Sequence, residues 1–181
     1  MTNFAADENK QWFVDLKKLV EDTFSLNDNE PVTFIAHSMG APMLVIFLQQ
    51  QPDSWKDKYI ARMITIAGAY GGSAKTVKVF AVGDDLGAYA LRAAWMREEQ
   101  ISMPSLAFLL PFPTFWKPDE ILVRTKSRTY TYAQLNEFFD DLGYPTGWEM
   151  RKDNFKYVDN FAPPNVEIHC IYGSQIDTVE V

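Results

Sequence analysis

Residues 31–40, PVTFIAHSMG, constrain the fold more than any other stretch of this chain. A short apolar run leads into the turn Ala-His-Ser-Met-Gly, and a second apolar run follows as far as Gln49. Such a strand, sharp turn and helix is typical of a nucleophile elbow, in which a serine hydroxyl is exposed above a sheet. The general pattern is Gly-x-Ser-x-Gly, and Ala36 stands at the first glycine position as the smallest replacement with a Cβ. The pattern predicts that Ser38 is a nucleophile for an acyl carbonyl.

The segments on either side of this turn predict a parallel βαβ unit. Residues 32–36 form a near-continuous apolar run, which is typical of a parallel strand covered on both faces. Residues 40–51 are mostly apolar on all sides and predict a buried helix, and residues 59–67 predict a second strand. Because the carboxyl ends of parallel strands meet at one edge of a sheet, we expect the turn at residues 69–72 to lie at the same edge as Ser38.

The rest of the sequence divides into a core, an insertion and a return to the core. Residues 1–72 are the predicted α/β core, which opens with an amphipathic helix over residues 6–24. Residues 73–164 lose the α/β alternation, and we interpret them as an inserted, mainly helical cap. Residues 165–181 return to the core sheet, with a strand over residues 166–173. The expected inward stripe of the first helix consists of Trp12, Phe13, Leu16, Leu19 and Val20.

Within the predicted cap, the best-marked helix covers residues 131–142. Thr131 and Gln134 have the spacing of a capping box, Gly143 supplies the stop, and the apolar stripe between them predicts packing in a core. Residues 108–116, FLLPFPTFW, are aromatic and interrupted by proline, so two interpretations stay open: the core of the cap, or an acyl-chain track or lipid-facing lid. The other expectations are helices over 74–82 and 89–100, a strand over 121–124 and a loop over 144–164.

Charge and composition exclude several classes of protein. The net charge is −7 and the chain has no basic run, which argues against nucleic acid as a partner. No stretch reaches the roughly 18 continuous apolar residues of a membrane span, and residues 1–13 have no signal-peptide pattern. The single cysteine, Cys170, cannot form an internal disulfide, so it is either a buried thiol of a cytosolic protein or the partner of a cysteine elsewhere.

A nucleophilic serine also needs a base, a carboxylate that orients the base, and donors for the oxyanion. The backbone N–H of Met39, the residue after the nucleophile, supplies one donor in this kind of turn. His37 leaves the turn in another direction and His169 lies inside an expected strand, so a structural role is favoured for both. Asp177 follows a strand, but no histidine follows it. The sequence therefore predicts no complete triad among these residues.

Several longer stretches carry a resemblance to one known family. They are AHSMG, then FLQQQPDSWKDKYI and ITIAGAYGGSAKTVKV, extended by TYTYAQLNEFFDDLGYPTGWEMRKD and VEIHCIYG. Together they resemble the lecithin–cholesterol acyltransferase family, and most closely its lysosomal (group XV) phospholipase A branch of animals. The resemblance covers residues 31–173 and is highly specific. Residues 69–72, AYGG, depart from the family's usual Pro-Trp-Gly-Gly.

The resemblance implies a partial α/β-hydrolase fold with a nucleophile elbow and an inserted cap. It implies a lipid O-acyltransferase or phospholipase A that takes a fatty acyl group from a glycerophospholipid, through an acyl-serine intermediate, to water or a lipid alcohol. Ser38 matches the family's nucleophile, Met39 its oxyanion-hole donor, and Cys170 a cysteine that pairs in the family with one further along. The resemblance also implies a membrane surface as partner and a lysosomal or extracellular setting. It implies no cofactor.

The family's catalytic Asp and His match no residue of this chain. We therefore expect an internal fragment of the parent enzyme, and we expect the 181-residue chain to be inactive by itself. One alternative is a non-catalytic remnant of the family that binds lipid or a protein partner. Another is an unrelated α/β-hydrolase that acts on soluble esters.

Overall fold

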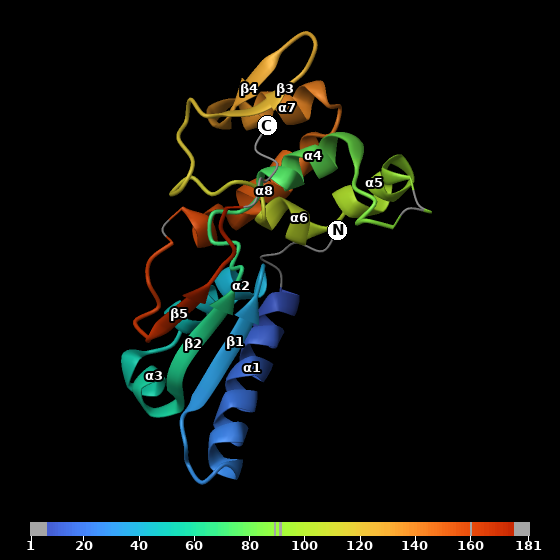
Figure 1. The fold of residues 1–181 in the computed structure, drawn as a ribbon. Coiled ribbons are helices and arrows are strands. Elements are labelled where there is room, and N and C mark those ends of the chain that lie inside the picture. The colour runs from blue at the N-terminus through green and yellow to red at the C-terminus, as the bar shows by residue number, and fades with distance from the viewer. Residues whose placement is uncertain (1–6, 89, 91, 160, 176–181) are drawn as a thin grey trace. The chain divides into compact units, whose positions relative to one another are not determined.

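The protein divides into two compact units, each described here by itself (Figure 1). The computed structural model describes residues 7–88, 90, 92–159 and 161–175. We use the name sheet unit for residues 7–70 and 161–175, and helical unit for the described residues from 71 to 159.

The sheet unit is built on three parallel strands. They are β1 (Val32–His37), β2 (Ile60–Ile66) and β5 (Ile168–Ile171), in the order β1-β2-β5. The register places Ala36 beside Thr65, and Thr65 beside Cys170. This parallel sheet with its helices confirms the predicted α/β class and the predicted parallel pairing of the first two strands.

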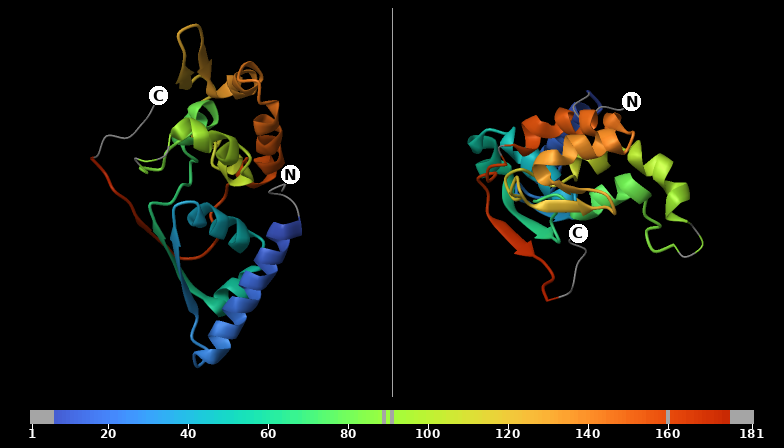
Figure 2. Two further views of the ribbon diagram at one scale, coloured as in Figure 1. Left: turned by 90° about the vertical axis from the view of Figure 1, so that its right-hand side faces the viewer. Right: turned by 90° about the horizontal axis from the view of Figure 1, so that it is seen from above.

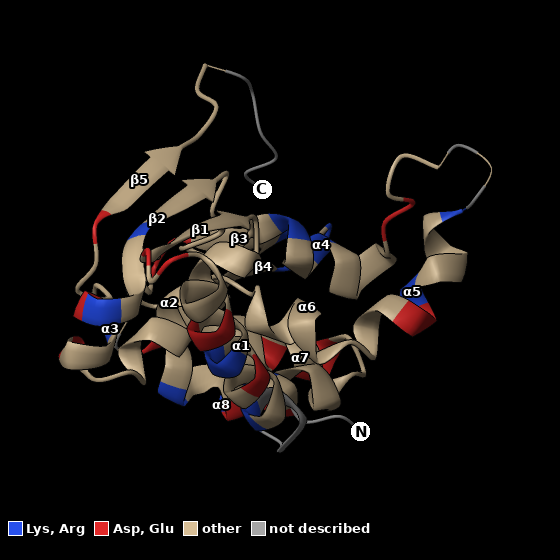
Figure 3. Cartoon of the chain, turned by 90° about the horizontal axis from the view of Figure 1, so that it is seen from below, with Lys and Arg blue, Asp and Glu red and all other residues tan. Residues whose placement is uncertain are grey.

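Three helices accompany the sheet: α1 (Asp7–Leu26), α2 (Gly40–Gln49) and α3 (Asp53–Tyr59). α1 and α2 lie on the same side of the sheet (Figure 2, left). α2 has no charged residue (Figure 3), and every residue from Ala41 to Leu48 is buried, as its uniform apolar sequence predicts. α3 was not predicted, because its short polar sequence DSWKDKY carries little hydrophobic periodicity.

Two expectations for the sheet unit are wrong. β1 is not covered on both faces, because the Ile35 side chain is 70% exposed and Ile66 and Ile171, on the same face, are exposed as well. The predicted inward stripe of α1 is too wide: Trp12 and Leu19 are exposed. α1 instead buries a narrow line consisting of Phe13, Val20 and Phe24.

The helical unit contains five helices and a two-stranded antiparallel sheet among its described residues. The elements are α4 (Ala74–Val82), α5 (Ala93–Ile101), α6 (Pro104–Phe108), β3 (Ile121–Arg124), β4 (Thr129–Thr131), α7 (Leu135–Asp141) and α8 (Pro145–Val158). The predicted capping box is confirmed: Thr131 and Gln134 cap a short 3₁₀ turn that runs into α7. The apolar stripe of α7 belongs to the core, as predicted, through Leu135, Phe138 and Phe139.

The segment 108–116 resolves into two parts. Phe108, Leu110 and Phe112 are fully buried, which favours the interpretation as core for this part, whereas Phe115 is exposed. The expected loop over 144–164 is wrong for residues 145–158, which form α8. The helix expected over 89–100 begins only at Ala93, and residues 89 and 91 lie outside the described residues. None of the helices in the described ranges combines the length and the hydrophobicity that crossing a bilayer requires.

Candidate nucleophile elbow

Ser38 lies in the two-residue turn between β1 and α2, at the carboxyl end of β1, an edge strand of the three-stranded sheet. Its backbone has φ of +51°, in the left-handed region that residues with a Cβ rarely adopt. A residue held in this region stores local strain, and strained backbone of this kind is concentrated at functional sites. The strand–turn–helix geometry is that of a nucleophile elbow.

Backbone hydrogen bonds hold Ser38 in this conformation. The Ser38 N–H donates to the Ile66 carbonyl at 3.0 Å, which continues the parallel ladder by one residue beyond β1. The Ser38 carbonyl accepts from the Ala41 N–H at 3.1 Å and from the Ala69 N–H at 3.2 Å. The second of these bonds brings the turn after β2 against the elbow, as the parallel topology predicts.

Two polar groups of the elbow have no partner in the part of the chain that the structure describes. The half-buried Ser38 makes no hydrogen bond through its hydroxyl, and the Met39 N–H donates none. Met39 is the N-cap residue of α2, where the helix dipole and unbonded N–H groups favour negative charge. A tetrahedral oxyanion formed at Ser38 would carry such a charge.

The closest packing at the elbow involves Gly68, which the sequence pattern did not identify. A Cβ on Gly68 would lie 2.9 Å from the Ala41 Cβ and 2.7 Å from the Tyr70 ring. A Cβ on Gly40, the second glycine of the motif, would lie 4.0 Å from the Ala36 Cβ, which is ordinary contact. Of the two glycines, Gly68 in the turn after β2 therefore leaves less space for a side chain, and part of that restriction comes from Ala41 of α2.

We expect Gly68→Ala to destabilise the sheet unit by about 1–3 kcal/mol, because the added methyl group overpacks the Ala41 contact. Gly40→Ala is the matched control, and its free energy of unfolding should change by less than about 1 kcal/mol, because alanine favours a helix and finds space there. Chemical unfolding of both variants checks this. Equal stability of the two variants would contradict the packing described here.

The structure does not join either histidine to Ser38 by a hydrogen bond among the described residues. His37 is exposed at the end of β1, and His169 is exposed in β5 with its Nε2 2.6 Å from Glu167 Oε1. The expected Asp177 lies outside the described residues. Cys170 is a free, exposed thiol, so the interpretation as a buried thiol is wrong. In the described ranges, no group of three or more His, Cys, Asp and Glu side chains is placed to hold a metal ion.

Comparison with known proteins places this elbow in a family. Residues 3–181 match the family model described as lecithin:cholesterol acyltransferase. The chain is 39% identical over 176 residues to the bovine (Bos taurus) lysosomal phospholipase A and acyltransferase, covering 97% of the chain and 43% of that protein. The human (Homo sapiens) protein of the same name is 38% identical over 174 residues, covering 96% of the chain and 42% of that protein.

A second group of relatives carries another name. The chicken (Gallus gallus) phosphatidylcholine-sterol acyltransferase is 34% identical over 173 residues, covering 96% of the chain and 42% of that protein. The chain thus spans about two-fifths of the length of the curated relatives that it matches. The resemblance seen in the sequence is confirmed, and the chain belongs to the lecithin:cholesterol acyltransferase family.

Proposed function

We propose that this chain carries the nucleophile of a phospholipid acyltransferase or phospholipase A. Ser38 Oγ attacks the acyl carbonyl of a glycerophospholipid, the glycerol oxygen leaves with a proton, and an acyl-serine ester forms. Water or a lipid alcohol then takes the acyl group and restores the serine. The Met39 N–H donates to the oxyanion in both steps. The observation that carries the proposal is the left-handed Ser38, with its hydroxyl and the next N–H unpartnered among the described residues.

The names of the relatives support the choice of substrate. The bovine relative is called a phospholipase A and acyltransferase, and the chicken relative transfers to a sterol by its name. We therefore assign glycerophospholipid as the acyl donor, water or a lipid alcohol as acceptor, and a membrane surface as the place of action. A lysosomal or extracellular setting belongs to the same proposal, as does the role of residues 73–164 as the cap of a partial α/β-hydrolase fold.

A chimera tests the proposed substrate. The 181 residues replace the matched segment of the bovine relative, which supplies the rest of that protein. We expect the chimera to release fatty acid from phosphatidylcholine vesicles and to form acyl-alcohol when a lipid alcohol is added. Turnover of short water-soluble esters without any turnover of phospholipid would contradict the proposed substrate class.

We expect the 181-residue chain by itself to release no fatty acid above background. Neither of its two histidines hydrogen-bonds Ser38 in the described residues, and removal of the base of a triad costs several orders of magnitude in rate. Phospholipid hydrolysis by the purified chain, with Ser38→Ala as the control, measures this. Serine-dependent turnover by the chain alone would contradict the expectation.

Since neither histidine hydrogen-bonds Ser38 among the described residues, a second candidate function is a non-catalytic module that binds lipid or a protein partner. This module would bind vesicles equally well with serine or alanine at position 38, and the chimera would also be inactive. An active chimera that requires Ser38 decides for the acyltransferase.

A further inference from the structure

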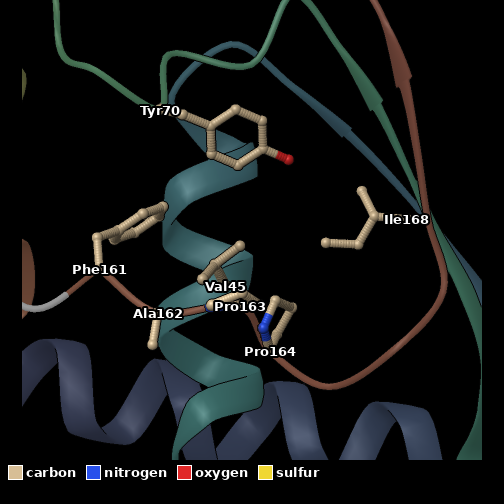
Figure 4. A pocket seen from close by; sticks show the side chains of 7 residues that line it. All are labelled: Val45, Tyr70, Phe161, Ala162, Pro163, Pro164 and Ile168. Atoms are coloured by element: carbon tan, nitrogen blue, oxygen red, sulfur yellow. The ribbon is translucent and has the colours of Figure 1, made fainter. Parts of the chain in front are cut away.

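The sheet unit contains a pocket that the elbow chemistry does not use (Figure 4). Its volume is about 190 Å³. Val45 of α2 and Ile168 of β5 form two sides, the segment Phe161–Pro164 forms a third, and the ring of Tyr70 closes one end. All of these residues belong to the sheet unit.

The pocket wall is fixed by side chains that bind its backbone. The Gln49 side-chain amide donates to the Ala162 carbonyl. The buried Lys56 ammonium donates to the Pro164 carbonyl at 2.9 Å and forms an ion pair with Asp53 at 2.7 Å. Two consecutive prolines stiffen the same segment. The pocket is therefore preformed, and a ligand need not order the wall when it binds.

The wall offers a ligand or water few hydrogen-bonding groups. The Ala162 and Pro164 carbonyls are already bound, and the Tyr70 Oη is shielded from solvent, without a hydrogen-bond partner among the described residues. Burial raises the pKa of Tyr70 above its ordinary value, so its hydroxyl stays neutral at physiological pH. A bound water needs two to four polar partners, which this wall does not supply.

We propose that this pocket is a binding site for an unbranched aliphatic chain. The lining is formed by Val, Ile, Pro, Ala and the rings of Phe161 and Tyr70, which match methylene groups and leave no charge to pair. The Tyr70 ring lies beside Gly68, and the N–H of the next residue, Ala69, donates to the Ser38 carbonyl. The site deepens the proposed function by placing one lipid chain along α2.

The direct test measures how the binding of linear alcohols to the full 181-residue protein depends on alcohol length. The protein carries Ser38→Ala, so the result does not depend on the acyl chemistry. The probes are butan-1-ol, hexan-1-ol and octan-1-ol, and the readout is the methyl NMR signals of Val45 and Ile168. We expect saturable shifts at both residues, with affinity rising about fourfold for each added methylene until the pocket is full. Absence of these shifts, or affinity independent of chain length, would overturn the proposal.

Variants of Tyr70 and Phe161 sharpen this test. Tyr70→Trp and Phe161→Trp enlarge two aromatic side chains of the pocket lining, and each should weaken hexan-1-ol binding at least about tenfold. Tyr70→Phe is the matched control, because it removes only the shielded hydroxyl, and its affinity should stay within about twofold. Tight binding by both enlarged variants would overturn the assignment to this pocket, and a folded Phe161→Trp keeps the test valid if Tyr70→Trp does not fold.

The two sources of an aliphatic chain are separated in the chimera. If the pocket holds the aliphatic chain of the acyl group, Tyr70→Trp changes the preference among donors of different acyl length. If the pocket holds the aliphatic chain of the acceptor alcohol, the preference among alcohols of different length changes instead. Unchanged preferences on both sides would overturn the link to lipid transfer, independently of whether Ser38 is the nucleophile.

Discussion

Ser38→Ala in the chimera should lower fatty-acid release from phosphatidylcholine vesicles by at least about a thousandfold. The methyl group of alanine cannot form the acyl ester, so only unassisted attack by water remains. The folded state should tolerate the change, because alanine replaces a small, half-buried side chain and every hydrogen bond of the elbow is made by the backbone. The loss should therefore appear in kcat with vesicle binding unchanged.

Two controls separate a chemical effect from a structural one. Ser102→Ala removes an exposed hydroxyl that bonds only the Glu99 carbonyl, and it should leave turnover within about twofold. His37→Gln tests the histidine beside the nucleophile, and we expect less than a tenfold loss because His37 is exposed and makes no hydrogen bond to Ser38 in the described residues. A loss of turnover in His37→Gln as large as that in Ser38→Ala would show that His37 is the base and would contradict its structural role.

Arg151→Ala should lower the free energy of unfolding of the helical unit by about 3–5 kcal/mol. Arg151 is fully buried and holds the segment that follows α6, donating from Nη1 to the Phe108 carbonyl at 3.2 Å and from Nη2 to the Pro111 carbonyl. Its guanidinium also lies over the rings of Phe112 and Phe155. Its removal leaves buried carbonyls unpaired and opens a cavity among these aromatic rings.

Charge and geometry contribute separately at this position. Burial lowers the pKa of Arg151 from its ordinary value, but a delocalised guanidinium keeps its charge in proteins. Arg151→Lys keeps the charge but lacks the planar guanidinium. It should therefore lower the free energy of unfolding by about half as much as Arg151→Ala does. Lys152→Ala is the exposed control on the same helix and should change stability by less than about 0.5 kcal/mol.

Hydrogen exchange and chemical unfolding measure these differences. Amide protection should fall in the helical unit for Arg151→Ala, because the buried carbonyls of the segment 107–111 lose their donor there. A change below about 1 kcal/mol, or unchanged protection, would show that the segment is held by packing alone.

The sequence predicted those elements whose inward residues are hydrophobic. α2 was predicted because Ala41–Leu48 are apolar on every side, and α7 because its stripe follows a capping box. α8 was missed because its buried line is Gly147, Arg151, Asn154 and Val158, which has helical spacing but mostly no hydrophobic character. Gly147 is required there because a Cβ would lie 2.4 Å from the Phe139 ring.

In the candidate site, the residues of the local motif could be predicted from the sequence, and those that depend on contacts distant in the sequence could not. Ser38 and Met39 follow from a local motif, since the elbow is made by consecutive residues. Gly68 and Tyr70 do not, because their roles depend on the register between β1 and β2 and on the segment 161–164, far away in the sequence. The exposure of Ile35 was also missed, since an apolar strand sequence does not show which of its faces another element covers.

The most direct measurement is the mass of the peptide that contains Ser38, taken from the chimera after reaction with phosphatidylcholine vesicles and an acid quench. We expect one fatty acyl group in ester linkage at Ser38, absent from the Ser38→Ala chimera and removed when an acceptor alcohol is added before the quench. An acyl group on any other residue of an active chimera, or full activity with alanine at position 38, would contradict this expectation.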